Sequence, residues 1–291
     1  MNLKKTIYII LIIVAISSLF FVFKNKDKEE TKILDFQEKK IKILLVPGHE
    51  PNAGGADEFK AIKERNLNLQ LSEILKNDLS NNPDIEVITA RDINGWNPDL
   101  KNYVETNKTE IMDWVFIMKK IMLEKINNGE IKLVNPGMKH NVATSSAVLY
   151  LYGTNKWIEE NNIDLVLHIH FNSNPKINGK PNFSGYCIYI PEKQYSNASS
   201  SRIFANYLNE GISKIQTPST MPQEKDLIIE DQALIATGNY NTLKIPSAVI
   251  EYAYMYEKIM TTTTTRNAFI EKAASSTATA ILKYIKEEIR N

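Results

Sequence analysis

Hydrophobic positions along the chain alternate between short β-branched runs and longer stretches with helical spacing. The run at residues 41–46 ends at Pro47 and Gly48, and a loop rich in Pro, Asn and Gly follows it. Residues 59–79 carry apolar side chains at helical spacing, and residues 85–90 form a second β-branched run. The order strand, loop, helix, strand predicts the opening of an α/β fold with a largely parallel sheet.

The second half of the chain continues this alternation. Residues 163–170 form an apolar run that is continuous enough to be a central strand. These elements predict a single three-layer domain over residues 41–291, in which helices flank a largely parallel central sheet. Further strands are predicted at 185–190 and 247–252, and helices at 143–161, 198–215 and 266–289.

Residues 92–140 are less regular, because Pro, Asn and Gly turns surround a single predicted helix at 110–126. We interpret this stretch as a helical insert beside the functional site. Two hypotheses remain open for it: a lid over the site, or ordinary packing at the periphery of the domain. The insert is also where a regulatory protein could act.

The first 40 residues differ in composition from the rest of the chain. Residues 1–5 form a short tail, residues 6–23 are an uncharged run rich in Ile, Leu, Val and Phe, and residues 24–40 are a charged tether. A run of about 18 apolar residues is just long enough to cross the hydrocarbon core as a helix. Bulky residues at 20–23 stand where a cleaved signal peptide has small ones, so we expect an uncleaved transmembrane anchor. Lysines on both sides of the run leave its orientation undecided.

Charge and cysteine content narrow the class of partner. The chain has 35 Lys and Arg against 34 Asp and Glu, a net charge of +1, so we expect no nucleic-acid partner. The single cysteine, Cys187, excludes an intramolecular disulfide. Because it lies in an apolar predicted strand, we interpret it as a small buried side chain.

Three of the four histidines lie at the ends of predicted strands. His49 directly follows the first strand, while His168 and His170 end the central strand on the same face. The carboxyl ends of parallel strands form a ligand-binding crevice, so these side chains are predicted to converge. His140, in a polar turn, is interpreted as an exposed bystander.

Two glutamates add carboxylates to this crevice. Glu64 lies early in the helix that follows the His49 loop, and Glu251 lies in an apolar strand. A buried glutamate is costly unless it has a partner or a catalytic role. Catalytic zinc sites use nitrogen and carboxylate ligands and keep one position open, which two histidines and one glutamate would satisfy.

Five segments resemble the zinc-dependent N-acetylmuramoyl-L-alanine amidases of the Amidase_3 type, in the order of that family. They are residues 45–49 (Leu-Val-Pro-Gly-His), 63–69 (Lys-Glu-Arg-Asn-Leu-Asn-Leu), 89–92 (Thr-Ala-Arg-Asp), 164–172 (Asp-Leu-Val-Leu-His-Ile-His-Phe-Asn) and 246–251 (Pro-Ser-Ala-Val-Ile-Glu). The strand that begins at residue 185 is also similar. The resemblance implies a Zn²⁺ cofactor held by His49, Glu64 and His170, with Glu251 as the catalytic base.

Two positions depart from the family pattern. Glu50 replaces the glycine that usually follows the first histidine, and it could narrow the pocket or add a charge. His168 stands where serine is common, which leaves His168 as an alternative ligand, although Asn172 favours His170. We expect His168, Asn172 and Glu50 to contact the substrate or to support the metal ligands.

The resemblance implies hydrolysis of the amide bond between N-acetylmuramic acid and L-alanine in peptidoglycan, which is the expected partner. We therefore expect a single-pass cell-membrane protein with its catalytic domain on the extracytoplasmic side. One alternative is a noncatalytic wall-binding or regulatory domain, which Glu50 favours. Another is a zinc hydrolase that acts on a different peptide or on an acylated sugar.

Overall fold

The computed structural model describes residues 39–58, 62–134, 143–173 and 182–290, and residues from Lys40 onward form one compact unit. The expected anchor at 6–23 and nearly all of the expected tether lie outside the described residues. Within these described ranges, no helix is both long and apolar enough to span a membrane.

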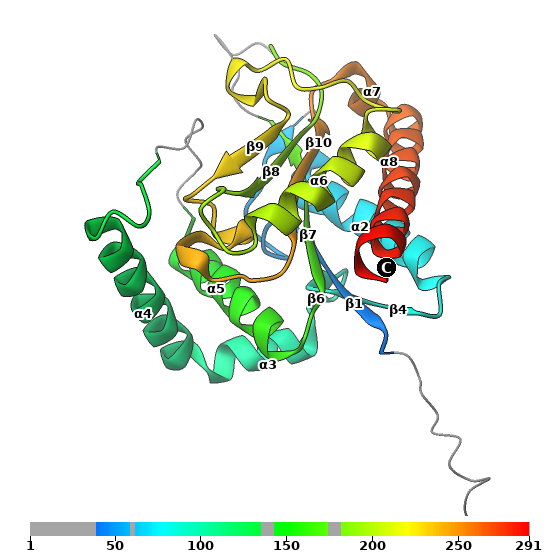
Figure 1. The fold of residues 1–291 in the computed structure, drawn as a ribbon. Helices are drawn as coiled ribbons and strands as arrows, with labels where there is room; N and C mark the ends of the chain where they lie inside the picture. The colour runs from blue at the N-terminus through cyan, green and yellow to red at the C-terminus, as the bar shows by residue number, and fades with distance from the viewer. Residues whose placement is uncertain (1–38, 59–61, 135–142, 174–181, 291) are drawn as a thin grey trace, which may run out of the picture. The chain divides into compact units, whose positions relative to one another are not determined.

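A six-stranded sheet with the order β4-β1-β7-β10-β8-β9 forms the centre of the domain (Figure 1). The first four strands in this order are parallel to one another, β8 is antiparallel to β10, and β9 is parallel to β8. This mostly parallel sheet confirms the predicted fold class. The strands are β1 (Ile41–Pro47), β4 (Ile85–Thr89), β7 (Leu165–Asn172), β8 (Cys187–Pro191), β9 (Ile228–Asp231) and β10 (Ser247–Tyr254), with two small pairs, β2 (Asp57–Glu58) with β3 (Ile62–Lys63) and β5 (Arg91–Asp92) with β6 (Gly95–Trp96).

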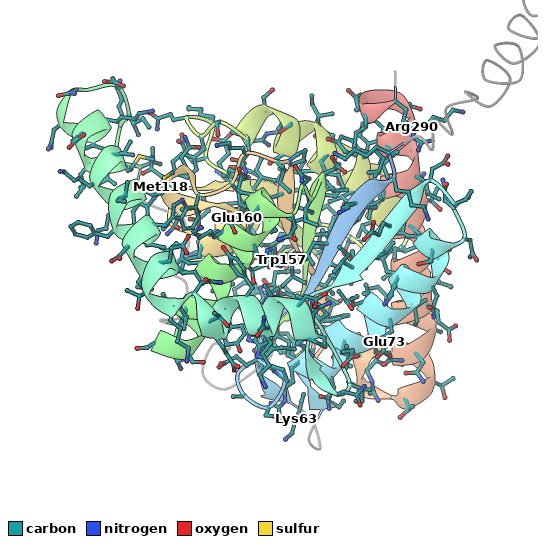
Figure 2. All side chains as sticks on the ribbon, turned by 90° about the horizontal axis from the view of Figure 1, so that it is seen from below. Lys63, Glu73, Met118, Trp157, Glu160 and Arg290 are labelled. Atoms are coloured by element: carbon teal, nitrogen blue, oxygen red, sulfur yellow. The ribbon has the colours of Figure 1, made fainter. Side chains whose placement is uncertain are left out.

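Helices cover both faces of the sheet, as the three-layer prediction requires. One face packs against α2 (Glu64–Ser80), α6 (Ala198–Ile212) and α8 (Thr263–Tyr284), and the other packs against α5 (Ser145–Glu160). Figure 2 views these layers from below, with β1 and β4 between the two sets of helices. The remaining helical segments are α3 (Pro98–Thr106), α4 (Lys108–Asn127), α7 (Lys258–Thr261), η1 (Pro222–Glu224), η2 (Ile235–Thr237), η3 (Asn239–Asn241) and the π-helical η4 (Ile285–Ile289).

Alternation along β7 decides which face carries the candidate site. Leu165, Leu167 and Ile169 are buried against α2, α6 and α8, whereas Val166 is buried in the cluster that includes α5. Because side chains alternate along a strand, His168 and His170 share the α5 face, as expected.

The described part of the insert, residues 92–134, packs against α5. Leu100 and Val104 of α3 and Ile111 and Val115 of α4 are buried together with Trp157 of α5. Figure 1 shows α4 on the far side of α5 from the sheet. The insert thus adds an outer helical layer on this side of the domain.

Two helix boundaries differ from the prediction for local reasons. The helix expected from residue 59 begins at Glu64, because residues 62–63 pair with β2. The last helix begins at Thr263 rather than at Arg266, because the Thr262 side chain accepts a hydrogen bond from the Thr265 N–H and caps it.

Candidate metal centre

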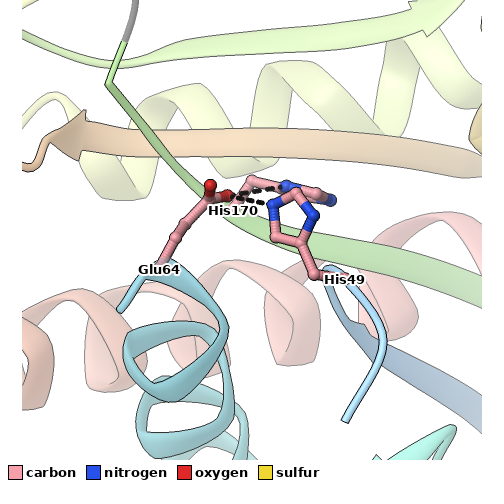
Figure 3. Close-up of side chains that lie close together, drawn as sticks. All are labelled: His49, Glu64 and His170. Atoms are coloured by element: carbon pink, nitrogen blue, oxygen red, sulfur yellow. Dashed lines mark hydrogen bonds and ion pairs between the residues drawn. The ribbon is translucent and has the colours of Figure 1, made fainter. Parts of the chain in front are cut away.

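Three segments that are far apart in sequence bring His49, Glu64 and His170 together. His49 lies on the loop after β1, Glu64 is the first residue of α2, and His170 lies near the end of β7 (Figure 3). Glu64 Oε1 is 2.8 Å from His49 Nε2 and 3.0 Å from His170 Nδ1. One ligand atom from each residue lies within 4.8 Å of the other two, a spacing at which all three could hold one metal ion.

The backbone around Glu64 fixes the direction of its carboxylate. Glu64 donates its N–H to Ala56 O at 2.9 Å, and Glu64 Oε2 accepts the Ala56 N–H at 3.1 Å. With Oε2 engaged by the backbone, Oε1 is left to face the two imidazoles (Figure 3). The start of α2 thus directs the Glu64 carboxylate toward His49 and His170.

Close packing against backbone positions the His170 ring. A Cβ atom at Gly48 would come within 2.2 Å of the ring, so the ring occupies the space that a side chain would need. Gly48 also donates its N–H to Ile169 O at 2.9 Å, which ties the His49 loop to β7. Glycine at position 48 is thus required by the imidazole that lies against it.

The surroundings of the cluster favour an ionised Glu64 carboxylate beside a neutral His170 imidazole. Burial raises the pKa of Glu64, but the hydrogen bond with His170 and the proximity of His49 outweigh it and hold this pKa far below its usual range. Burial lowers the pKa of His170 more than its contact with Glu64 raises it. An ionised carboxylate and a neutral imidazole are the forms in which these side chains bind a divalent metal.

The chemistry of the donor atoms also fits a metal ion. His49 Nε2 is buried and, although it lies 2.8 Å from Glu64 Oε1, it makes no hydrogen bond among the described residues. The short distance alone does not make a hydrogen bond, because orientation decides whether a proton is shared. An unsatisfied imidazole nitrogen that faces a carboxylate and a second imidazole matches the nitrogen and oxygen ligands of zinc.

Glu251 lies beside this cluster in the sheet. It is in register with His170 of β7 on one side and with Cys187 of β8 on the other. Burial raises the pKa of Glu251 well above its usual range, and the nearby charges of Glu64 and Glu224 raise it further. Its Oε2 atom is buried without a hydrogen-bond partner in the described part of the chain, so it is free to bind a proton or a substrate group.

The structure separates His168 from the three clustered residues. His168 is 1% exposed, and burial lowers its pKa to about 3, so the ring is neutral. His170, and not His168, is the histidine of β7 that lies next to Glu64. On this geometry His170 is the better candidate ligand.

The other candidate residues have separate partners. Glu50 Oε1 accepts a hydrogen bond from Ser146 Oγ at 2.8 Å, at the start of α5. Asn172 donates from Nδ2 to Glu224 Oε1 at 3.2 Å. Cys187 is buried, as expected, and burial raises the pKa of its thiol. His140 lies outside the described residues.

Glu224 is a buried carboxylate that the sequence patterns do not mark. It connects three strands, because it accepts hydrogen bonds from Asn172 of β7, from Tyr189 OH of β8 at 3.0 Å and from Tyr254 OH of β10 at 2.8 Å. Ser219 Oγ donates to it as well. Four donors satisfy a carboxyl group that would otherwise be costly to bury. Glu224 ends the three-residue helix η1, within a polar stretch of sequence that has no strand or long-helix periodicity, so only its three-dimensional contacts reveal it.

Two kinds of comparison place these observations among known proteins. The sequence matches the family model described as N-acetylmuramoyl-L-alanine amidase over residues 119–283, more than half of the chain. That stretch contains His170 and Glu251 and begins after His49 and Glu64. No curated protein matches the sequence.

Several solved structures share the fold at low sequence identity. The N-acetylmuramoyl-L-alanine amidase from Clostridium difficile 630 aligns with a TM-score of 0.52 and 16% identity, over 86% of this chain and 100% of that one. The apo form of the amidase Ami1 from Mycobacterium abscessus aligns with a TM-score of 0.53 and 13% identity, over 85% and 99%. The catalytic domain of the amidase CwlV from Bacillus (Paenibacillus) polymyxa var. colistinus aligns with a TM-score of 0.51 and 15% identity, over 84% and 98%. At these identities the likeness concerns the fold.

Proposed function

The chain belongs to the N-acetylmuramoyl-L-alanine amidase family and is a hydrolase, and from this premise we propose a zinc-dependent mechanism for it. In this proposal His49, Glu64 and His170 hold Zn²⁺, and the enzyme cleaves the amide bond between N-acetylmuramic acid and L-alanine in peptidoglycan. The observation that carries the proposal is the convergence of the three side chains within 4.8 Å of one another, with Glu251 on the neighbouring strand.

The metal ligands and Glu251 have different roles in the proposed reaction. When bound, zinc supplies Lewis-acid chemistry that polarises a carbonyl group and makes water acidic near neutral pH. Glu251 takes a proton from the attacking water and passes it to the nitrogen of the leaving amine. Its raised pKa supports this role, because the protonated form can serve as the donor. Glu64 stays ionised because its carboxylate faces two imidazoles.

Zinc content and product analysis test this proposal together. We expect one zinc per chain in the wild type, loss of zinc in His170→Ala, and retention of zinc in the matched control His168→Ala on the same strand face. Muropeptides treated with the wild type should release peptides that begin with L-alanine, as detected by mass. Equal zinc in wild type and His170→Ala would remove His170 from the ligand set. Cleavage of a different bond would remove the substrate assignment.

We propose further that residues 6–23 anchor the protein in the cell membrane, with the catalytic domain on the extracytoplasmic side. The uncharged apolar run supports the anchor, and the location of peptidoglycan supports the side. Deletion of residues 1–23 should move the protein from the membrane fraction to the soluble fraction. External protease should degrade the domain of the full chain in intact protoplasts, and protection of the domain would contradict the proposed side.

We also propose that a regulatory protein acts on the insert. Support comes from α4, where Phe116 is 70% exposed and Ile117 is 54% exposed, together with other exposed apolar residues of the same helix. The double substitution of Phe116 and Ile117 by serine should leave cleavage of purified muropeptides unchanged and reduce wall turnover in cells. Equal turnover in cells would contradict this role of α4.

A further inference from the structure

Arg91 is a buried cation at the back of the candidate metal centre. It is 2% exposed and begins the small strand β5, which is separated from the end of β4 by Ala90. Its guanidinium donates hydrogen bonds to four backbone carbonyl oxygens. Nε lies 3.0 Å from both Pro47 O and His49 O, while Nη2 lies 2.7 Å from Gly48 O and 2.8 Å from Arg65 O.

These four carbonyls belong to the two segments that carry His49 and Glu64. Pro47, Gly48 and His49 are consecutive residues where the chain leaves the sheet, so their carbonyls need partners outside a regular ladder. Arg65 immediately follows Glu64 in α2. One planar side chain thus connects the first ligand loop to the helix that carries the second ligand.

The backbone of His49 needs such support. Its φ is +69°, a left-handed conformation that costs energy in a residue other than glycine and persists only when the surroundings hold it. Arg91 donates hydrogen bonds to the carbonyl oxygens of His49 and of the two residues before it. Asn68 of α2 adds a second donor, from Nδ2 to Gly48 O at 3.2 Å.

Arginine is suited to this position and lysine is not. Burial lowers the pKa of Arg91 to about 10, which still leaves it charged at neutral pH. A guanidinium offers five donors in one plane, so it can reach carbonyls on both segments at once. A lysine ammonium offers three donors around a single atom and cannot replace that fork.

We infer that Arg91 is a positioning residue of the metal centre, which holds the His49 and Glu64 segments in the geometry that binds zinc. The inference rests on the proposed function, because it assumes that these residues are metal ligands. Arg91 touches neither the metal nor the substrate in this role; it acts through the backbone of the two ligand segments. Its loss should weaken zinc binding while all three ligands remain present.

The test is the zinc affinity of the full chain, measured by competition with a zinc chelator well below the melting temperature. Residues that orient metal ligands typically change affinity by about 10- to 100-fold, and we expect a loss of this size in Arg91→Lys. Arg202→Lys is the matched control. It makes the same substitution at an arginine that pairs with Glu230 at 2.5 Å, beside the opposite edge strand β9, and it should stay within about two-fold of wild type.

A second variant and a second readout separate positioning from general loss of stability. Without zinc, Arg91→Lys should stay as fully folded as the zinc-free wild type at the assay temperature, as measured by circular dichroism, and its activity should recover at high zinc concentration. A merely unstable protein would be partly unfolded in its zinc-free form. If Arg91→Lys does not fold, Asn68→Ala serves as the test variant instead. It removes the weaker hydrogen-bond donor to Gly48 O and should lower zinc affinity by a smaller factor. If the wild type binds zinc normally and the variant that folds has the same zinc affinity, the inference about the positioning role is wrong, while the proposed metal site stands. Absence of zinc from the wild type would overturn both the inference and the proposed metal site.

Discussion

Gly48 lies where the first ligand loop passes against the His170 ring, and its missing side chain is a requirement of that contact. In Gly48→Ala the new methyl group would enter the space of the ring, 2.2 Å from its nearest atom, so the imidazole must move away from Glu64. We expect zinc affinity to fall by about ten-fold or more, as measured by chelator competition. Gly129→Ala is the control. Its φ of +75° strains an alanine, but nothing lies within 4 Å of a Cβ there and the residue follows α4 rather than a ligand segment, so this variant should keep wild-type zinc affinity.

Substitution of Glu251 tests the proposed catalytic base separately from the proposed metal ligands. Glu251→Gln keeps the shape of the side chain but cannot accept a proton from water. A general base contributes about 10²- to 10⁴-fold, so we expect kcat for muropeptide cleavage to fall by that factor while zinc content is unchanged. Glu230→Gln, at the surface pair with Arg202, should keep full activity. Full activity in Glu251→Gln would show that another residue is the base.

At the residue scale, sequence reasoning pointed to the candidate ligands because each one lies at or near the end of a predicted element. His49 follows a strand, Glu64 opens a helix, and His170 ends a strand in which the alternation rule fixes the face. Arg91 and Glu224 could not be assigned roles in this way. Their partners are backbone carbonyls and hydroxyl groups from distant segments, and no spacing rule connects them.

Among the elements, the contact between α3 and α5 depends on Gly153. A Cβ at this position would lie 2.6 Å from Val104 Cγ2, which belongs to a stiff β-branched side chain. Overpacking of this kind costs about 1–3 kcal/mol, more than the ~1 kcal/mol that alanine gains over glycine in a helix. We therefore expect Gly153→Ala to lower the free energy of unfolding, as measured by urea denaturation.

A double-mutant cycle checks the cause. In the Val104→Ala background the nearest remaining atom is Ile111 Cδ1 at 3.3 Å, the flexible end of a side chain that can move by a few tenths of an ångström, so Gly153→Ala should raise the free energy of unfolding instead. The same sign in both backgrounds would show that Val104 is not what limits position 153.

Elements with strong periodicity were predicted well, and short elements in polar surroundings were missed. The predicted strands and long helices are present within a few residues of their expected ends. α3 was missed because the turn residues before it suggested a loop. The sequence nevertheless contains a signal for the start of this helix. The Asn97 side chain caps it by accepting hydrogen bonds from Asp99 N and Leu100 N, and Pro98 occupies the first turn. β9 is four residues long and half acidic, so only its pairing with β8 defines it as a strand.

For the whole molecule, the proposed zinc ion should stabilise the fold. Its three ligands come from a loop, a helix and a central strand, an arrangement that the unfolded chain lacks. A ligand that binds only the folded state at 100 times its Kd adds about 2.7 kcal/mol to the free energy of unfolding. We expect a chelator to lower Tm and added zinc to restore it, as measured by circular dichroism. His170→Ala should show no such zinc-dependent shift, and an equal shift in that variant would place the stabilising ion elsewhere.

The residues of the candidate metal centre lie far apart in the sequence, so most of the chain must be synthesised before the centre can form. Glu64 and His170 are 106 residues apart, and β7 must settle between β1 and β10 before their side chains meet. A growing chain presents His49 and Glu64 early, His170 much later, and Glu251 later still. Products of premature termination before β7 therefore carry two of the proposed ligands and lack the proposed base. With the proposed ligands and base, such fragments would lack hydrolytic activity, which would arise only when nearly the whole polypeptide exists.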